Sequence, residues 1–182
     1  MHRLFVALRP PREVRALLAS AMSGVPQARW QDDEQLHLTV RYIGEVDRPL
    51  AEDIAITLGQ VHAPAVTARI EGVGAFDKSG RIDTLWAGVV PAEPLAALHR
   101  KVDQALVRVG LEPERRAYRP HVTLARLPRS AGFGTAIDHW RADHAMLASP
   151  DFALDTLILC ESRLGGEGAH YTHVAHWPLV GA

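Results

Sequence analysis

The sequence predicts an α+β fold of two lobes, each with a mostly antiparallel sheet and helices on its outside. The order strand, helix, strand, helix, strand occurs twice along the 182 residues. A short polar pattern also recurs at matching places, since His37 and His121 lie 84 positions apart while Phe5 and Trp86, in the opening strands, lie 81 apart. Near-equal offsets favour two related modules, joined by a pseudo-twofold, with the two motifs in matching places. We expect one bilobal domain, residues 1–182, with pseudo-repeats of about 1–80 and 81–182.

The first module begins with a short apolar strand at residues 3–9. Two prolines then precede a helix, and the next strand, residues 36–44, is closed by Gly44. A second helix is predicted at residues 49–62 and a third strand at 65–76. The apolar stripe that predicts the first helix consists of Val14, Leu17, Leu18 and Met22.

The second module repeats this order. It begins with a strand at residues 84–90, and a helix that Gly110 ends follows it. The apolar stripe of this helix consists of Leu95, Leu98, Val102, Leu106 and Val109. The remaining predicted elements are strand 120–128, a helix near 135–147, and strands at 152–160 and 169–179.

Composition bounds the class of protein. Hydrophobic residues make up 47% of the chain, which is ample for a core and argues against wholesale disorder. The formal net charge of -1 argues against a protein that coats nucleic acid by overall charge. The apolar run near the N-terminus covers only residues 4–8, too short for a signal peptide, and no later segment approaches membrane-spanning length. We expect a cytoplasmic monomer without a membrane partner.

The repeated pattern reads "LHLTVRYIG" at residues 36–44 and "PHVTLARLP" at 120–128. Side chains alternate along a strand, so His37, Thr39 and Arg41 should share one face while Leu38 and Val40 point into the core. Histidine and threonine then stand roughly 6.5 Å apart on one surface. That spacing suits two groups that bind different atoms of one small anion. The second motif repeats the arrangement with His121, Thr123, Val122 and Leu124.

Four converging side chains of this kind suit phosphoryl chemistry. Hydroxyls donate hydrogen bonds to phosphate oxygens. Two imidazoles, whose ordinary pKa is about 6.5, can act as acid and base near neutral pH. A strained cyclic phosphodiester could be opened in this way without a metal ion. A lone His-x-Thr usually marks just a strand, but two copies at matching places favour a functional pair.

Paired His-x-Thr-x motifs in a chain of this size resemble the 2H phosphoesterases, and specifically their RNA 2',3'-cyclic phosphodiesterase branch, also called 2'-5' RNA ligases. The resemblance covers nearly the whole chain. Besides the motifs, the matching segments are "RLFVALRPP", "LWAGV" and "ESRLGGEGAHYTHVAHWPL". Small departures are Tyr42, where phenylalanine is common, and "RPP", where an acidic residue is frequent.

The resemblance implies a bilobal fold whose two motifs face each other across a central cleft. It also implies hydrolysis of an RNA terminal 2',3'-cyclic phosphate to a 2'-phosphate, with no metal and no cofactor. By motif match, His37 is the proton donor and His121 the proton acceptor, while Thr39 and Thr123 hold the phosphate. The partners expected are RNA 3' ends or cyclic nucleotides, with tRNA fragments among the candidates. Two alternatives stay open: 2'-5' ligation as the physiological direction, and a non-catalytic module that binds RNA ends.

Two arginines are further candidates for phosphate binding. Arg41 shares the face of His37 in a regular strand, although structural pairing with an acid is an equal alternative. Arg126 belongs to a segment, residues 115–129, with five arginines and no acid, next to Tyr118, which could stack on a base. Strict alternation places Arg126 on the face opposite His121, so a bulge or strand end is needed to turn it inward.

The C-terminal histidines invite a metal hypothesis. Alternation along one strand places His173 on one face and both His170 and His176 on the other, so the three would not converge on an ion. No phosphate-binding glycine loop and no serine nucleophile motif occurs in the sequence. We therefore expect no metal site.

Overall fold

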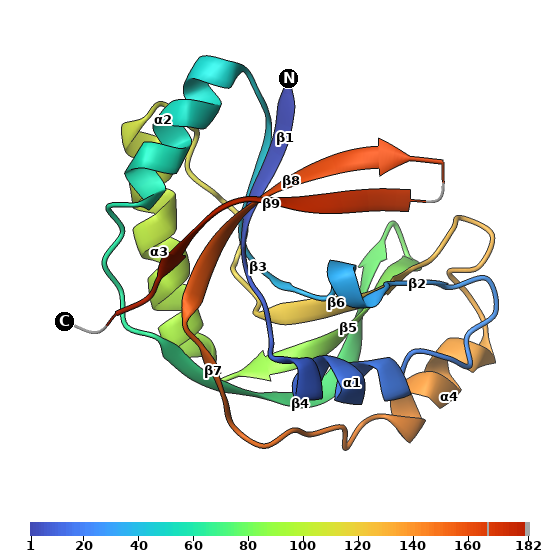
Figure 1. Cartoon of the computed structure of the whole chain (residues 1–182). Helices are drawn as coiled ribbons and strands as arrows, with labels where there is room; N and C mark the ends of the chain where they lie inside the picture. The colour runs from blue at the N-terminus through green and yellow to red at the C-terminus, as the bar shows by residue number, and fades with distance from the viewer. Residues whose placement is uncertain (167, 181–182) are drawn as a thin grey trace.

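The computed structural model describes residues 1–166 and 168–180. The α+β class is confirmed, and helices and strands follow one another nearly as predicted (Figure 1). In chain order the elements are β1 His2–Leu8, α1 Arg12–Ser20, β2 Arg29–Trp30, the 3-10 turn η1 Asp33–Gln35, β3 Leu38–Val46, α2 Arg48–Leu58, β4 Val66–Lys78, β5 Arg81–Val90, α3 Ala92–Arg108, β6 His121–Arg126, α4 Thr135–Asp143, β7 Phe152–Leu154, β8 Thr156–Gly165 and β9 Gly168–Pro178.

The strands form one sheet in the order β7-β4-β5-β6-β3-β1-β8-β9, with β2 added on β6. Every strand pairing in it is antiparallel. The sheet has two halves, and these meet where β3 lies beside β6. That junction consists of a single register pair, Leu38 with Val122. The two predicted sheets are thus joined edge to edge, and the strands diverge on either side of the joint.

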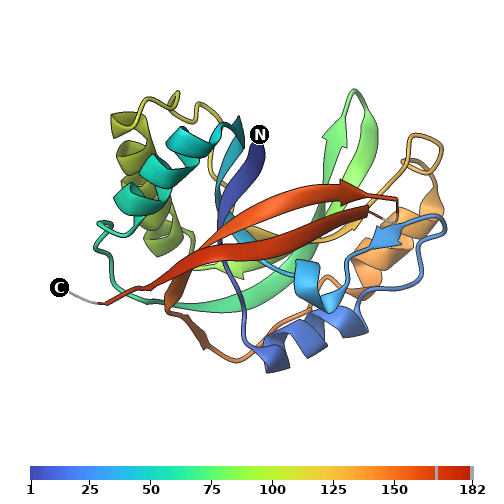
Figure 2. The same cartoon turned by 45° about the horizontal axis from the view of Figure 1, so that its top comes forward.

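Strands are exchanged between the two modules. β4, from the first half of the chain, pairs with β5, while β8, from the second half, pairs with β1 (Figure 2). One half of the sheet is therefore β9-β8-β1-β3 and the other β7-β4-β5-β6. The exchange makes each half of the sheet depend on both halves of the chain. The repeat boundary near residue 80, which falls in the β4–β5 turn, stays a prediction.

The helices lie in two pairs. Figure 1 shows α2 and α3 side by side at one end of the sheet and α1 and α4 at the other. The predicted stripe of α3 is its buried face, on which Leu95, Leu98, Val102 and Leu106 are at most 2% exposed. α2 begins at Asp47, whose carboxylate accepts a hydrogen bond from the backbone N–H of Leu50 at 3.0 Å. Within the described residues, no helix is long and apolar enough to cross a membrane.

Short elements were missed in the sequence. β2 and η1 lie where a loop was expected, and the strand expected at 152–160 is divided into β7 and β8. η1 is stabilised by a reciprocal cap: Asp32 accepts a hydrogen bond from Gln35 N at 2.9 Å, and the Gln35 side chain accepts one from Asp32 N at 2.9 Å. Elements of two or three residues show no hydrophobic period, so periodicity could not reveal them.

Candidate active site

The two motifs meet at the joint between the halves of the sheet. Leu38 and Val122 form the joint and are 0% exposed, so their neighbours on each strand point to the opposite, open face. Residues directly opposite each other on antiparallel strands have Cβ atoms about 5 Å apart. Continued by one residue on each side of the Leu38–Val122 pair, the antiparallel register brings each histidine toward the threonine of the other motif: His37 toward Thr123, and His121 toward Thr39.

Both motif imidazoles are held by the same backbone contact. His37 Nδ1 lies 2.7 Å from the carbonyl oxygen of Gln35, and His121 Nδ1 lies 2.6 Å from that of Arg119. A carbonyl oxygen only accepts, so Nδ1 carries the proton in each ring. In the neutral imidazole, Nε2 is then the basic nitrogen. Nε2 is therefore the nitrogen of each ring that can take up a proton.

Thr39 is engaged with the histidine of its own motif. Its hydroxyl lies 3.0 Å from His37 Nε2 and donates to this nitrogen while the ring is neutral. Protonation of His37 at Nε2 reverses the contact, because the ring then donates and the hydroxyl is free to donate elsewhere. The protonation state of His37 and the direction in which the Thr39 hydroxyl donates are thus coupled.

The environment lowers the pKa of both imidazoles. Burial lowers the pKa of His37 from 6.5 to about 4, and the charges of His121 and Arg126 act in the same direction. Burial is also the main cause that lowers the pKa of His121, with a smaller effect of Arg126. Both rings are therefore neutral at pH 7 in the protein without substrate.

Aromatic rings account for this burial. Two flank each histidine, one from the adjacent strand (Phe5 on β1, Trp86 on β5) and one from a more distant strand (Tyr171 on β9, Phe76 on β4), and they replace water beside the imidazole. The ring-centroid distances are 4.8 Å for Phe5–His37, 5.3 Å for Tyr171–His37, 4.9 Å for Phe76–His121 and 6.1 Å for Trp86–His121.

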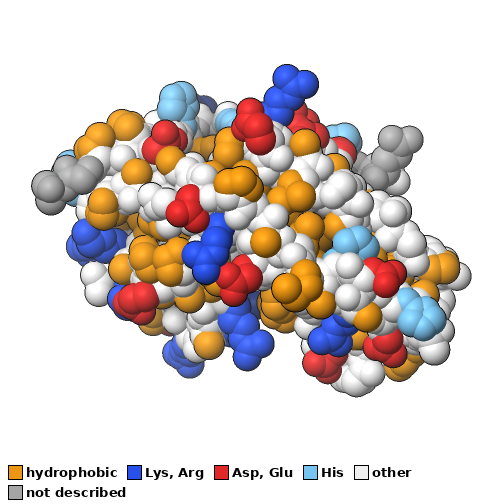
Figure 3. Space-filling view, turned by 90° about the horizontal axis from the view of Figure 1, so that it is seen from below, with side chains coloured by type: hydrophobic (Ala, Val, Ile, Leu, Met, Phe, Trp, Pro, Cys, Tyr) orange, Lys and Arg blue, Asp and Glu red, His pale blue; other side chains and the backbone are white. Residues whose placement is uncertain are grey.

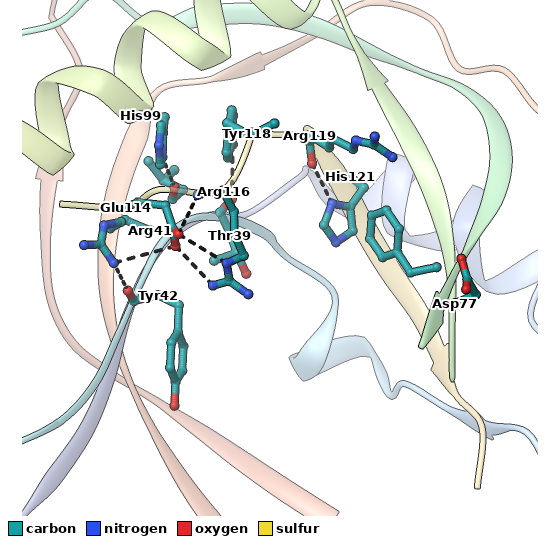
Figure 4. Close-up of a pocket in the computed structure, with 13 residues that line it drawn as sticks. Thr39, Arg41, Tyr42, Asp77, His99, Glu114, Arg116, Tyr118, Arg119 and His121 are labelled. Atoms are coloured by element: carbon teal, nitrogen blue, oxygen red, sulfur yellow. Dashed lines mark hydrogen bonds and ion pairs between the residues drawn. The ribbon is translucent and has the colours of Figure 1, made fainter. Parts of the chain in front are cut away.

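Two hollows open on this face, and they share Thr39 and Tyr42. The smaller, about 160 Å³, contains His37, Thr123 and Arg126 among its lining residues. The larger, about 510 Å³, is the one in Figure 4, where His121 lies on one side. The motif residues predicted from sequence thus line two adjoining parts of one open face.

Arg126 reaches this face through a bulge in β6. Across from β5, Thr123 pairs with Trp86 and Ala125 with Leu85, which leaves Leu124 as an extra residue. The extra residue restores Arg126 to the side of Thr123. Its guanidinium donates to the Thr84 hydroxyl at 2.8 Å. The sequence prediction for Arg126 required a bulge or a strand end to turn it inward, and the bulge is present.

A matching bulge in β3 places Arg41 on the other side of the strand from Thr39, although its side chain still lines the larger hollow, away from His121 (Figure 4). Opposite β1, Ala7 pairs with Thr39 and Val6 with Arg41, so Val40 is extra. The expectation that Arg41 shares the face of His37 was therefore wrong, because it assumed regular alternation. The side chain is buried, and its Nε donates to the Asp103 carboxylate at 2.7 Å. The alternative, structural pairing with an acid, is what the structure contains.

The bulge in β3 brings forward a residue that sequence reasoning did not select. Tyr42 takes the place in the first motif that Arg126 has in the second, and it lines both hollows. The signal was present in the sequence only as equal spacing, since each residue lies five positions after its histidine. Strand alternation without a bulge hides this equivalence.

Tyr118 is half-buried and lines the larger hollow, and it is fixed there by two contacts. Its ring stacks on that of His99, with centroids 4.4 Å apart and planes 5° apart (Figure 4). Its hydroxyl donates to the carbonyl oxygen of Thr39 at 3.1 Å, and burial raises its pKa. His99 Nδ1 in turn lies 2.7 Å from the carbonyl oxygen of Val40. These contacts satisfy the edge of β3 where it diverges from β6.

The C-terminal histidines lie on β9, and residues 1–166 and 168–180 contain no group of three His, Cys, Asp or Glu side chains arranged to hold a metal ion. The positive charge that His173 can carry is one of the minor influences that lower the pKa of His37. His170 lies against the end of β8, where a Cβ on Gly165 would come within 3.1 Å of its ring.

Comparison with known proteins decides the family. Residues 10–166 match the model of the 2'-5' RNA ligase superfamily. This chain belongs to the 2'-5' RNA ligase superfamily. The resemblance to 2H phosphoesterases drawn from the paired motifs is confirmed.

Relatives in the superfamily include an RNA 2',3'-cyclic phosphodiesterase from Aeropyrum pernix, 36% identical over 108 residues, which are 59% of this chain and 61% of the relative. One of the same name from Geobacillus stearothermophilus is 29% identical over 167 residues, 89% of this chain and 51% of the relative. The chain thus spans less than two thirds of the length of either. The apo crystal structure of E. coli LigT shares the fold, with a TM-score of 0.78 and 23% identity over 99% of this chain and 98% of that one. LigT has also been solved with 3'-AMP.

Proposed function

We propose that the protein hydrolyses the terminal 2',3'-cyclic phosphate of RNA to a 2'-phosphomonoester by acid and base catalysis at two histidines. The observation that carries the proposal is the register at the joint, which brings each motif histidine toward the threonine of the other motif. The names of the relatives supply the substrate class. A protein of the same fold, LigT, has been solved with a nucleotide, 3'-AMP.

The reaction needs two proton transfers. Neutral His121 accepts a proton at Nε2 from a water molecule, whose oxygen forms a bond to phosphorus. The bond from phosphorus to the 3' oxygen breaks, and that oxygen takes the proton that His37 holds on Nε2. The product is a 2'-phosphate with a free 3' hydroxyl. Each positioned transfer contributes roughly 10²–10⁴-fold. The choice of His37 as donor and His121 as acceptor follows the family resemblance.

Substrate binding favours the protonated form of His37, which is scarce in the free protein at neutral pH. The donor must be protonated, yet the pKa of His37 is about 4 without substrate. The negative charge of a bound cyclic phosphate favours the charged imidazole and raises its pKa. In the free protein, the positive charge of Arg126 contributes to the lowered pKa of both rings, and the bound phosphate offsets that charge. Protonated His37 then releases the Thr39 hydroxyl to donate to a phosphate oxygen.

No metal enters this scheme, because the two imidazoles perform both transfers and the threonine hydroxyls with Arg126 bind the anion. We therefore propose that a chelator leaves turnover unchanged. Inactivation by EDTA that added divalent metal reverses would contradict the two-histidine scheme.

The test is incubation with a 2',3'-cyclic nucleotide, followed by identification of the phosphomonoester formed. Wild-type protein should form the 2'-phosphate, and His37→Ala and His121→Ala should each lose turnover by at least roughly 10²-fold. His139→Ala is a matched control, since His139 is an exposed histidine on α4. Undiminished turnover in either motif variant would end the proposal.

The two alternatives have distinct outcomes in further assays. If a 5' hydroxyl replaces water, the same groups join it to the cyclic end and form a 2'-5' linkage, the reaction for which the superfamily is named. Incubation with tRNA halves measures that direction against hydrolysis. A non-catalytic module would bind a 2'-phosphorylated nucleotide and leave its cyclic precursor intact.

A further inference from the structure

A basic hollow lies at the tip of the β4–β5 hairpin. It has a volume of about 310 Å³ and is lined by Lys78, Ser79, Arg81, Arg129 and Phe133, three cations and no acid. Phe133 is 69% exposed. On the face in Figure 3, by contrast, acidic and basic side chains are mixed. We refer to these five residues as the hairpin-tip pocket.

The pocket is built from two segments that the backbone holds together. The N–H of Ile82 donates to the carbonyl oxygen of Gly132 at 3.1 Å, and that of Leu127 donates to the carbonyl oxygen of Asp83 at 2.9 Å. Figure 2 shows the hairpin rising beside the segment that follows β6. The loop that carries Arg129 and Phe133 is thus docked on the start of β5.

Arg81 is fixed within this pocket. A Cβ on Gly132 would lie 2.1 Å from Arg81 Cγ and 2.5 Å from the carbonyl oxygen of Ile82, so the glycine backbone packs directly on the arginine stem. Among the described residues, the buried Nε of Arg81 has no hydrogen-bond partner. This nitrogen is closed off from solvent, but Arg81 as a whole is only half-buried and lines the hollow, so an anion there can contact the rest of its guanidinium.

The pocket lies next to the open face of the two motifs. Lys78 follows Phe76 by two positions on β4 and so points to the same side, and the ring of Phe76 contacts His121 at 4.9 Å between centroids. On β5, Arg81 precedes Thr84, the hydrogen-bond partner of Arg126, by three residues, roughly 10 Å of strand. The cations of the pocket therefore extend the charge of Arg126 away from the reacting centre.

We propose that the hairpin-tip pocket binds the single-stranded RNA upstream of the reacting 3' end, an inference that rests on the proposed function. Lys78, Arg81 and Arg129 bind backbone phosphates, and the exposed ring of Phe133 stacks on a base. Cations interleaved with an exposed aromatic ring are the usual means of holding single strands without sequence preference. Because the pocket and the hollows that contain the histidines share no lining residue, we expect the pocket to favour longer RNA ends over free cyclic nucleotides.

The test measures binding, so that it does not depend on turnover. Fluorescence anisotropy would compare a short oligoribonucleotide ending in a 2'-phosphate with the 2'-mononucleotide, on wild-type protein and on Arg81→Ala/Arg129→Ala. The variant should lose roughly tenfold in its preference for the oligonucleotide. The slope of log affinity against log salt should become shallower by about 0.7 for each backbone phosphate that the variant no longer neutralises.

Two further variants separate charge from position. Gly132→Ala keeps every charge but displaces the Arg81 stem, and should also reduce the preference. Arg108→Ala removes an exposed cation on α3 and should leave the preference and the slope unchanged. An unchanged preference in Arg81→Ala/Arg129→Ala would overturn the inference, even if cyclic nucleotides are hydrolysed. A reduced preference in a protein that hydrolyses nothing would retain the pocket and remove the proposed function. The inference would also be overturned if Arg81→Ala/Arg129→Ala lost binding to anionic lipid vesicles while its affinity for RNA stayed unchanged.

Discussion

The hydroxyl of Thr84 connects Arg126 to an acid. It accepts a hydrogen bond from the Arg126 guanidinium at 2.8 Å and donates one to the Asp83 carboxylate at 2.9 Å. Thr84 is 2% exposed and lies directly opposite Arg126 in the β5–β6 register. This buried contact holds the arginine against β5 at the edge of the hollow that contains His37.

Thr84→Val should therefore weaken substrate binding while the histidines stay intact. The valine removes the acceptor that orients Arg126, and we expect KM for a 2',3'-cyclic nucleotide to rise about three- to tenfold, with a smaller change in kcat. Arg126→Ala should raise KM further, and Thr67→Val, an exposed strand position, should change neither constant. A normal KM in Thr84→Val would show that Arg126 does not need the Thr84 hydroxyl to hold its position.

The pH dependence of activity follows from the lowered pKa values of the histidines. One ring must be protonated and the other neutral, and in the free protein both pKa values lie below 6.5. We expect kcat/KM, which reports the free protein, to peak below pH 6.5 and to fall as pH rises. The kcat profile should peak at higher pH, because bound phosphate raises the pKa values. A kcat/KM maximum above pH 7.5 would contradict this arrangement.

A leaving group that needs no proton separates the two histidines. The p-nitrophenolate released from a p-nitrophenyl phosphodiester is stable as an anion, so the proton donor becomes dispensable while the base does not. If His37 is the donor, His37→Ala should retain about 10²-fold more of its wild-type activity on this substrate than on the cyclic nucleotide. His121→Ala should lose both activities alike. The opposite pattern would reverse the assignment.

The ion pair of Arg41 should contribute to stability. Its Nε donates to Asp103 at 2.7 Å, and Asp103 also accepts from the backbone N–H of Glu114 at 3.1 Å. Arg41→Ala leaves a largely buried carboxylate without its cation, and we expect a loss of about 3 kcal/mol in the free energy of unfolding, measured in urea. Arg48→Ala breaks an exposed pair with Glu52 and should cost less than about 0.5 kcal/mol. Equal effects of the two substitutions would refute a structural role for Arg41.

Much of the geometry of the candidate site was predictable because its signals are local. Alternation in a strand is fixed by backbone geometry, so Leu38 and Val122 had to be buried if His37 and Thr123 were to be accessible. Helical stripes were equally reliable, as in α3. Alternation failed at Val40, where one added residue reversed the predicted side of Arg41. A bulge depends on the partner strand, and no feature of the residues at 40 or 124 announces it.

By itself, the sequence determined the α+β class, the element order and the two His-x-Thr motifs, because periodicity and residue type act over a few positions. Only the tertiary structure decided which strands pair. The exchange of β4 and β8 and the Leu38–Val122 joint are contacts between distant parts of the chain, governed by how both apolar faces are buried together. The lowered pKa of His37 has the same origin, since Phe5 and Tyr171, remote in sequence, exclude water from its ring.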